Sequence, residues 1–143
     1  MKPECMTLAD VPRVAFIESR VSLSPWSQAI FRDCLKAKYH CWVYRADQVS
    51  AYLVLSCAAE EAHLLNIAVE PKEQGKGLGG NFLDFAIAQG REERVRRIFL
   101  EVRPSNRRAQ ALYRSRGFAL LHERKDYYGP PHPENALVFF LDL

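Results

Sequence analysis

A glycine-dense loop between a strand pattern and a helix pattern constrains this chain more than any other feature. Residues 63–69 form an apolar strand pattern, a short polar turn follows, and four glycines within residues 75–80 precede a helical pattern at residues 81–88. Glycine permits positive φ and close approach of the backbone, so several N–H groups can point at one anion. A helix N-terminus attracts the same charge through its dipole. The loop therefore predicts a site for a phosphorylated cofactor.

Length and charge exclude several classes of protein. The 143 residues, 48% hydrophobic and 26% charged, suit one domain spanning residues 1–143. No apolar run approaches the ~18 residues of a membrane span, and no signal peptide is recognisable, so we expect a cytoplasmic protein without a membrane partner. A net charge of +3 does not indicate a dedicated nucleic-acid binder. The arginines within residues 91–116 form a solvated face or attract an anionic cofactor or an acidic, RNA-rich partner.

The cysteines and histidines give no sign of a metal site. The four cysteines form no C-x-x-C pair, and the four histidines are isolated from one another along the chain. Such cysteines are interpreted as reduced thiols, some of them packed as small apolar groups. We therefore predict no metal, and no cysteine stands in a motif typical of a nucleophile.

The remaining patterns alternate between helical and extended periodicity. The expected elements, in order, are helices over residues 11–18 and 24–35, a hairpin of strands 41–44 and 49–55, a strand at 63–69, a helix ending near 90, a strand at 97–102, a helix at 105–116 and strands at 119–125 and 136–141. This order predicts an α/β protein with a mixed sheet and helices on its faces.

Two common phosphate-binding motifs fit the loop poorly. A P-loop places a hydroxyl residue after its lysine, whereas Lys76 is followed by Gly77. The dinucleotide fingerprint G-x-G-x-x-G is matched literally by Gly75, Gly77 and Gly80. In that fingerprint the first glycine follows the strand almost at once, whereas residues 70–74 intervene here. The chain after the loop is also short for the further βαβ units of a dinucleotide domain.

A third interpretation fits better. Gln74, Gly77 and Gly79 form Gln-x-x-Gly-x-Gly, which resembles the pyrophosphate loop of the GNAT superfamily of acetyl-CoA-dependent N-acetyltransferases. The resemblance spans nearly the whole chain. Within the superfamily, the chain resembles most the branch that acetylates the N-terminal alanine of a small-subunit ribosomal protein. The segments that carry this closer resemblance are residues 24–27, 65–69, 100–106, 111–118 and 126–128. It implies the GNAT (acyl-CoA N-acyltransferase) fold, an α/β fold with a central mixed, mostly antiparallel sheet flanked by helices and a splayed strand pair at the cofactor site.

The resemblance also assigns the residues that bind acetyl-CoA. It implies pantetheine contacts from the backbone of Ile67, Ala68 and Val69, and a pyrophosphate cradle of Gly75, Lys76, Gly77, Leu78, Gly79 and Gly80. Asn106 is either a helix N-cap or a further cofactor contact. Gly80 stands where these enzymes often carry arginine, so one phosphate contact is weaker or is supplied by Lys76.

Glu101 and Tyr113 are the predicted catalytic residues. Strand alternation puts Glu101 opposite the aliphatic residues of its strand, where it is a solvated carboxylate or, by resemblance, the general base. Tyr113 shares a helix face with Ala109 and Leu112. It is therefore a core aromatic residue or, by resemblance, the acid that protonates the departing thiolate.

The resemblance implies transfer of an acetyl group to a protein α-amine, with a ribosomal protein N-terminus as partner. The expected acceptor is the N-terminal alanine of the eighteenth small-subunit ribosomal protein. An α-amine of pKa ~8 costs about 3 kcal/mol less to deprotonate than a lysine of pKa ~10.4, which suits a single carboxylate base. Trp26 and Tyr128 line the acceptor groove or are ordinary packing. Two alternatives stay open: another acceptor, such as a small amine, an antibiotic or a lysine, and a non-catalytic acyl-CoA-binding module.

Overall fold

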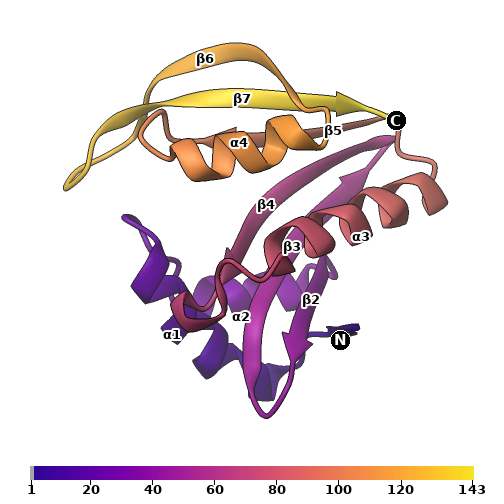
Figure 1. The fold of residues 1–143 in the computed structure, drawn as a ribbon, viewed down its shortest axis with the longest axis vertical. Helices are drawn as coiled ribbons and strands as arrows, with labels where there is room; N and C mark the ends of the chain where they lie inside the picture. Colours follow the sequence, from indigo (N-terminus) through magenta and orange to yellow (C-terminus); the bar gives the residue numbers. More distant parts are fainter. Residues whose placement is uncertain (1) are drawn as a thin grey trace.

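The computed structural model describes residues 2–143 as one mixed sheet with helices on its faces (Figure 1). The strand order is β1-β2-β3-β4-β5-β7-β6, and neighbours are antiparallel except β4 and β5, which are parallel. The elements are β1 (Pro3–Cys5), η1 (Leu8–Asp10), α1 (Val11–Val21), α2 (Gln28–Lys36), β2 (His40–Arg45), β3 (Val49–Ala58), β4 (Glu61–Val69), η2 (Pro71–Glu73), α3 (Leu78–Glu92), β5 (Arg97–Val102), α4 (Arg107–Ser115), β6 (Ala119–Tyr128) and β7 (Glu134–Asp142). The predicted mixed, mostly antiparallel α/β architecture is confirmed.

Helices cover both faces of strands β2 to β4. On one face α1 and α2 pack through Ile17 and Phe31 against Tyr52 of β3. On the other face α3 packs through Phe82 against Leu53 and its neighbours. The first seven residues of β3 are buried without interruption, because each face of that strand meets a helix layer. Figure 1 shows α3 and the α1–α2 pair on different sides of these strands.

The predicted elements are all present. The structure adds the short strand β1 and the 3-10 turns η1 and η2, and the other differences lie at the ends of elements. The second helix begins at Gln28 rather than Ser24, because the Ser27 hydroxyl accepts the N–H of Ile30 and caps the helix there. The closing hairpin is longer than predicted, since β6 and β7 stay paired as far as Tyr128 and Glu134. Within residues 2–143, no helix combines the length and apolar character needed to cross a membrane.

Candidate active site

β4 and β5 separate halfway along β4. Their parallel pairing covers only Glu61–Leu64 against Arg97–Leu100. At the same point the register of β4 against β3 shifts by one residue, which leaves a bulge at Leu65. Figure 1 shows the two strands diverging beyond it. The predicted splayed strand pair is confirmed, and the backbone of β4 after Leu64 is not engaged by β5.

The larger cavity at this opening, about 460 Å³, is bounded by the end of β4, the glycine loop and α4. The predicted cofactor residues that line it are Ile67, Ala68, Val69, Gly75, Gly77, Leu78, Gly79, Gly80 and Asn106. Lys76 is the exception, and its Nζ lies 2.8 Å from a carboxylate oxygen of Glu73, which does line the cavity. The structure therefore gathers all but one of these residues around a single cavity.

The glycine loop presents backbone donors to this cavity. Gly75 and Gly77 have φ of +82° and +81°, a left-handed conformation that disfavours any side chain. Gly77 is the N-cap of α3 and offers no side-chain acceptor, and the first intrahelical bond of this turn runs from Asn81 N–H to the Gly77 carbonyl. The amides of residues 78–80 therefore have no helical acceptor one turn earlier. Such a helix start binds phosphate oxygens.

The motif glutamine fastens the loop to two other elements. Gln74 donates from Nε2 to the Val69 carbonyl at 3.0 Å, which ties the loop to the end of β4. Its Oε1 accepts a 2.8 Å hydrogen bond from Arg108 of α4. Arg108 also lines the cavity, so it adds a positive charge beside the loop. The arginine-rich composition of this region was the signal for Arg108, although sequence alone did not single out this residue.

A second cavity of about 440 Å³ opens on the other side of the gap. Val21, Ile67, Asn106 and Tyr113 line both cavities, so the two spaces adjoin where the strands part. The second cavity is more polar, with Glu18, Ser24, Trp26, Asn66, Glu101, Arg103 and Tyr128 in its wall. The arrangement allows one substrate to enter from each side and meet at the shared residues.

Glu101 lines the second cavity and Tyr113 lines both, and their catalytic roles stay predictions. Glu101 projects from β5 into the wall of the second cavity, with 18% of its side chain exposed, and Arg124 of β6 lies 3.7 Å away. Tyr113 of α4 packs against Phe118 and Phe139 and also lines both cavities. Burial raises the pKa of Tyr113 above its usual value, so the phenol holds its proton at neutral pH. Tyr113 is thus a packed residue that keeps its hydroxyl proton, and its role as the acid stays a prediction.

Asn106 caps helix α4. Its side-chain oxygen accepts the N–H of Ala109 at 3.1 Å, so the predicted N-cap is confirmed. The residue also lines both cavities, and its contact with a cofactor stays a prediction.

Glu18, a buried glutamate that sequence reasoning missed, links the elements that line the second cavity. Glu18 of α1 accepts hydrogen bonds from the Tyr52 hydroxyl at 2.5 Å, the Trp26 backbone at 3.0 Å and Asn66 Nδ2 at 3.1 Å. These bonds join α1, the segment before α2, β3 and the splayed part of β4. The available signal was a charged residue among the buried positions Val14 and Ile17 of an amphipathic helix.

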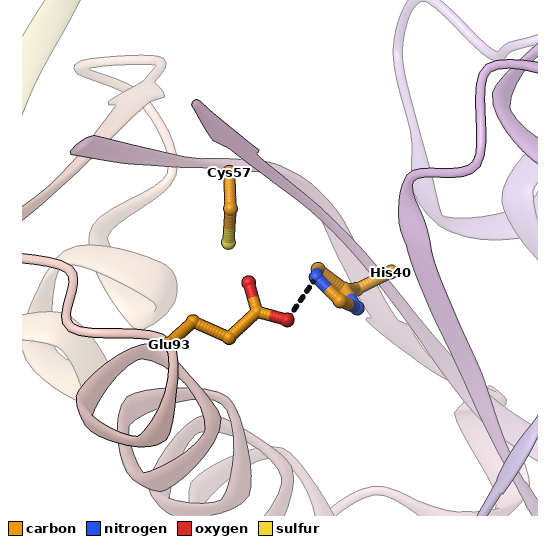
Figure 2. Close-up of side chains that lie close together, drawn as sticks. All are labelled: His40, Cys57 and Glu93. Atoms are coloured by element: carbon orange, nitrogen blue, oxygen red, sulfur yellow. Dashed lines mark ion pairs between the residues drawn. The ribbon is translucent and has the colours of Figure 1, made fainter. Parts of the chain in front are cut away.

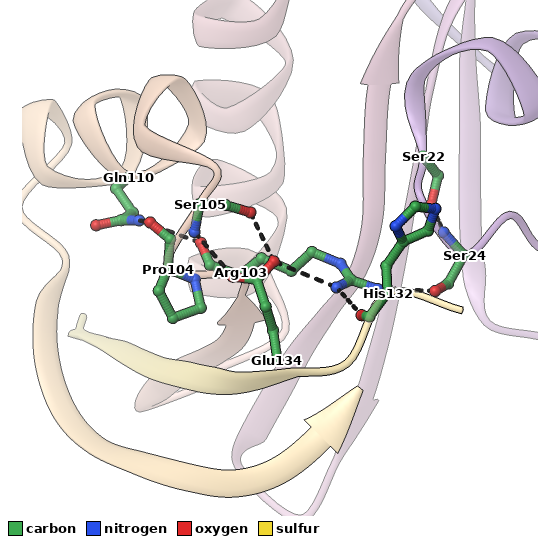
Figure 3. Close-up of polar contacts among 8 residues, drawn as sticks. All are labelled: Ser22, Ser24, Arg103, Pro104, Ser105, Gln110, His132 and Glu134. Atoms are coloured by element: carbon green, nitrogen blue, oxygen red, sulfur yellow. Dashed lines mark hydrogen bonds and ion pairs between the residues drawn. The ribbon is translucent and has the colours of Figure 1, made fainter. Parts of the chain in front are cut away.

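Arg103, directly after β5, lines the second cavity and contacts residues from distant segments of the chain (Figure 3). Its guanidinium donates to the Ser24 hydroxyl and to the His132 carbonyl, each at 2.7 Å, and lies 3.3 Å from Glu134. It also lies 4.0 Å from the Tyr128 ring centre. Arg103 is buried, so these contacts are shielded from water. Trp26 and Tyr128 line this cavity, and Tyr128 is half-buried there with a pKa raised by burial to about 12.

Comparison with known proteins agrees with this geometry. Residues 7–118 match the Acetyltransferase (GNAT) family. The [Ribosomal protein bS18]-alanine N-acetyltransferase of Haemophilus ducreyi is 35% identical over 143 residues, which cover 98% of this chain and 99% of the relative. The crystal structure of the ribosomal-protein-S18-alanine N-acetyltransferase from Escherichia coli superposes with a TM-score of 0.90 at 31% identity, covering 99% of this chain and 92% of that one.

A third neighbour shows the fold with a ligand. A Bacillus subtilis acetyltransferase in complex with CoA has a TM-score of 0.79 at 18% identity and covers 99% of this chain and 98% of its own. The fold and the paired cavities define an acyl-CoA-dependent transferase. The chain belongs to the GNAT family of acetyltransferases.

Proposed function

We propose that this enzyme transfers the acetyl group of acetyl-CoA to a protein N-terminal α-amine, with the N-terminal alanine of small-subunit ribosomal protein S18 as acceptor. The observation that carries the proposal is the pair of adjoining cavities that share Tyr113, with Glu101 in the acceptor-side wall. The names of the relatives support the acceptor. Ribosomal proteins are made in the cytoplasm, which is therefore the proposed location.

The first cavity suits acetyl-CoA. The amides at the start of α3, with Arg108 beside them, meet a diphosphate, while the backbone of Ile67, Ala68 and Val69 meets the amide groups of pantetheine. This contact requires splayed strands, because the backbone N–H and C=O groups of a fully paired β4 would be hydrogen-bonded to β5. The acyl group then lies near Tyr113, where the second cavity begins.

The second cavity offers an incoming amine a carboxylate and two aromatic side chains. Its wall combines two aromatic residues, Trp26 and Tyr128, with the carboxylate of Glu101. A protonated α-amine is attracted to that carboxylate, which is then placed to take its proton. An α-amine of pKa ~8 needs about 3 kcal/mol less for this step than a lysine of pKa ~10.4, which favours the α-amine over the alternative acceptor.

The proposed reaction is a direct transfer. Glu101 accepts a proton from the acceptor ammonium, directly or through water, and the neutral nitrogen attacks the thioester carbonyl carbon. Amides of the splayed segment of β4 stabilise the negative charge that develops on the carbonyl oxygen. The C–S bond breaks, and Tyr113 donates its proton to the departing thiolate. The new amide nitrogen loses its remaining excess proton to solvent, Glu101 releases its proton to solvent, and Tyr113 is reprotonated from solvent.

A peptide acetylation assay tests the acceptor. The full chain is incubated with acetyl-CoA and a peptide that carries the N-terminal residues of S18 starting at alanine, with one internal lysine. Mass spectrometry of fragments is expected to place a single acetyl group on the α-amine. A matched peptide with a formylated α-amine is expected to stay unmodified. Acetyl groups on lysine alone, or thiol release only with small amines, would overturn the acceptor assignment. Binding of CoA without turnover of any amine would favour the non-catalytic module.

A further inference from the structure

Three side chains that can bind a metal ion lie close together at the C-terminal end of α3, away from both cavities. His40 begins β2, Cys57 lies near the end of β3 and Glu93 follows the last residue of α3. One ligand atom from each of these residues lies within 4.8 Å of the other two (Figure 2). None of the three lines either cavity described above. Sequence patterns could not reveal this cluster, because strand pairing and the length of α3 bring together residues that are far apart in the chain.

Strand register places the first two ligands on one face. His40 is opposite Leu55 in the β2–β3 ladder, and Cys57 lies two residues beyond Leu55 on the same strand. Their side chains therefore project from the same side of the sheet. Leu55 belongs to the apolar cluster under α3, so this is the side on which the helix ends. Glu93 then reaches back to both groups.

The imidazole is held in place by aromatic packing. The His40 ring stacks on Trp42 at 5.3 Å with an interplanar angle of 11°, and Trp42 meets Phe85 of α3 edge-on at 4.9 Å. This stack orients His40 Nε2 towards Glu93, whose Oε1 lies 2.9 Å away. Figure 2 shows the Cys57 sulfur and the His40 ring both facing the Glu93 carboxylate. The ligand atoms therefore converge without help from a bound ion.

We propose that His40, Cys57 and Glu93 form a binding site for a borderline-soft divalent metal ion, Zn²⁺ in particular. Sulfur, imidazole nitrogen and carboxylate oxygen are the donors that zinc prefers. Metal–ligand bonds of about 2.0–2.3 Å in a tetrahedron place the ligand atoms about 3.3–3.8 Å apart, so shifts of about 1 Å close the site. His40 and Glu93 are partly exposed, at 32% and 40% of their side chains, so water can supply the fourth ligand. Coordination converts the Cys57 thiol to a thiolate and releases its proton to solvent.

The ion would join β2 and β3 to the end of the helix whose start carries the glycine loop. Since the site lines neither cavity, the ion would stabilise the fold and would take no part in the transfer reaction. It is therefore independent of the proposed acceptor, and its test does not use activity.

Cobalt titration provides the test, because a thiolate bound to Co²⁺ gives a strong near-ultraviolet charge-transfer band. The full wild-type chain, reduced and metal-free, is expected to develop this band at one equivalent of Co²⁺ and to lose it when Zn²⁺ is added. Cys57→Ser is expected to abolish the band, and Glu93→Gln to weaken Zn²⁺ binding at least tenfold in competition with a chromophoric chelator. Cys5→Ser, which removes an exposed thiol elsewhere, is the matched control and should bind as wild type does. No thiolate band in the wild type, or an unchanged band in Cys57→Ser, would overturn the site.

A measurement on the wild type alone guards against misfolded variants. Cys57 alkylation by iodoacetamide is followed by mass spectrometry with and without Zn²⁺. The site predicts that saturating Zn²⁺ slows modification of Cys57 at least tenfold while Cys5 reacts at an unchanged rate. Equal protection of both thiols, or protection of neither, would contradict it.

Discussion

The guanidinium of Arg103 lies 2.7 Å from the hydroxyl of Ser24, and this contact joins the end of β5 to the segment between α1 and α2. The same guanidinium donates to the His132 carbonyl in the segment between β6 and β7. Three parts of the chain that are distant in sequence thus meet around one buried cation. Arg103 and Ser24 line the second cavity and not the first, so we expect Arg103 to affect the second cavity more than the first.

Arg103→Ala is therefore expected to raise KM for the acceptor peptide at least about tenfold, since hydrogen bonds from a charged group contribute about 1.5–3 kcal/mol each. KM for acetyl-CoA should change less than twofold. Arg97→Ala, which removes a partly exposed arginine at the start of β5 that lines neither cavity, is the control and should alter neither constant. Steady-state kinetics with each substrate varied in turn measures both. Equal effects on the two KM values would show general loss of structure instead of a role at the second cavity.

Glu101→Gln keeps the size of the side chain and removes its ability to accept a proton. We expect kcat to fall by about 10²–10⁴, the usual contribution of a general base, with CoA binding unchanged in calorimetry. Glu61→Gln, at the exposed start of β4, should leave kcat as in wild type. A Glu101→Gln enzyme with near-normal kcat would remove Glu101 from the mechanism.

Tyr113 gives a pH prediction. Burial raises its pKa above the ordinary value of 10.0, so the phenol keeps its proton and its acid function throughout pH 7–10. Tyr113→Phe should lower kcat about 10²-fold or more, and the ratio of wild-type to variant kcat should stay constant up to pH 10. The pH profiles of the two proteins supply the ratio. A ratio that declines towards one between pH 8 and 10 would mean that the residue ionises in that range.

Two cations near the glycine loop should contribute unequally to CoA affinity. Arg108 lines the cavity and is held by Gln74, whereas Lys76 does not line it and its charge is paired with Glu73. Arg108→Ala is expected to weaken CoA binding about tenfold, because a charged contact to phosphate is lost. Lys76→Ala should weaken it less than about threefold, as expected for an exposed group. Calorimetric titration with CoA measures the loss of affinity in each variant. A larger loss in Lys76→Ala than in Arg108→Ala would reject Arg108 as the main phosphate contact.

Gly80 and Arg116 should be coupled in stability. A Cβ on Gly80 would lie 2.9 Å from Cζ of Arg116, whose Nε lies 3.1 Å from Asp84. In an Arg116→Ala background, Gly80→Ala should stabilise the protein by about 0.5–1 kcal/mol, the usual gain from glycine to alanine within a helix. In the wild type this gain should shrink or reverse, because Arg116 must move. Urea unfolding of the four proteins gives the coupling energy, and strictly additive effects would contradict the contact.

The sequence predicted the fold well because its signals were local. The period of the apolar residues defined the strands, the glycines marked the loop, and the alternation around Glu101 placed that side chain on the polar face of β5. The splayed strands were predicted from the family resemblance alone, since the sequence of residues 65–69 does not indicate a bulge at Leu65. Only pairing with β3 reveals it.

The parts of the site that could not be predicted depend on contacts between distant segments. Glu18 could not be singled out from sequence, because only the fold brings Tyr52, Trp26 and Asn66 to its carboxylate. The grouping of His40 with Glu93 depends on where α3 ends relative to the sheet, which periodicity does not determine. Burial and hydrogen bonding between elements are properties of the assembled fold.

We propose that two substrates meet through the gap between β4 and β5. The most direct measurement is a crystal structure with a bisubstrate compound in which the sulfur of CoA is joined through an acetyl linker to the α-amine of an alanine-initiated peptide. We predict the diphosphate at the start of α3, the linker beside Tyr113, and the peptide in the cavity walled by Glu101 and Arg103. Binding of the compound with either half outside its assigned cavity, or with the linker away from the gap, would contradict the account.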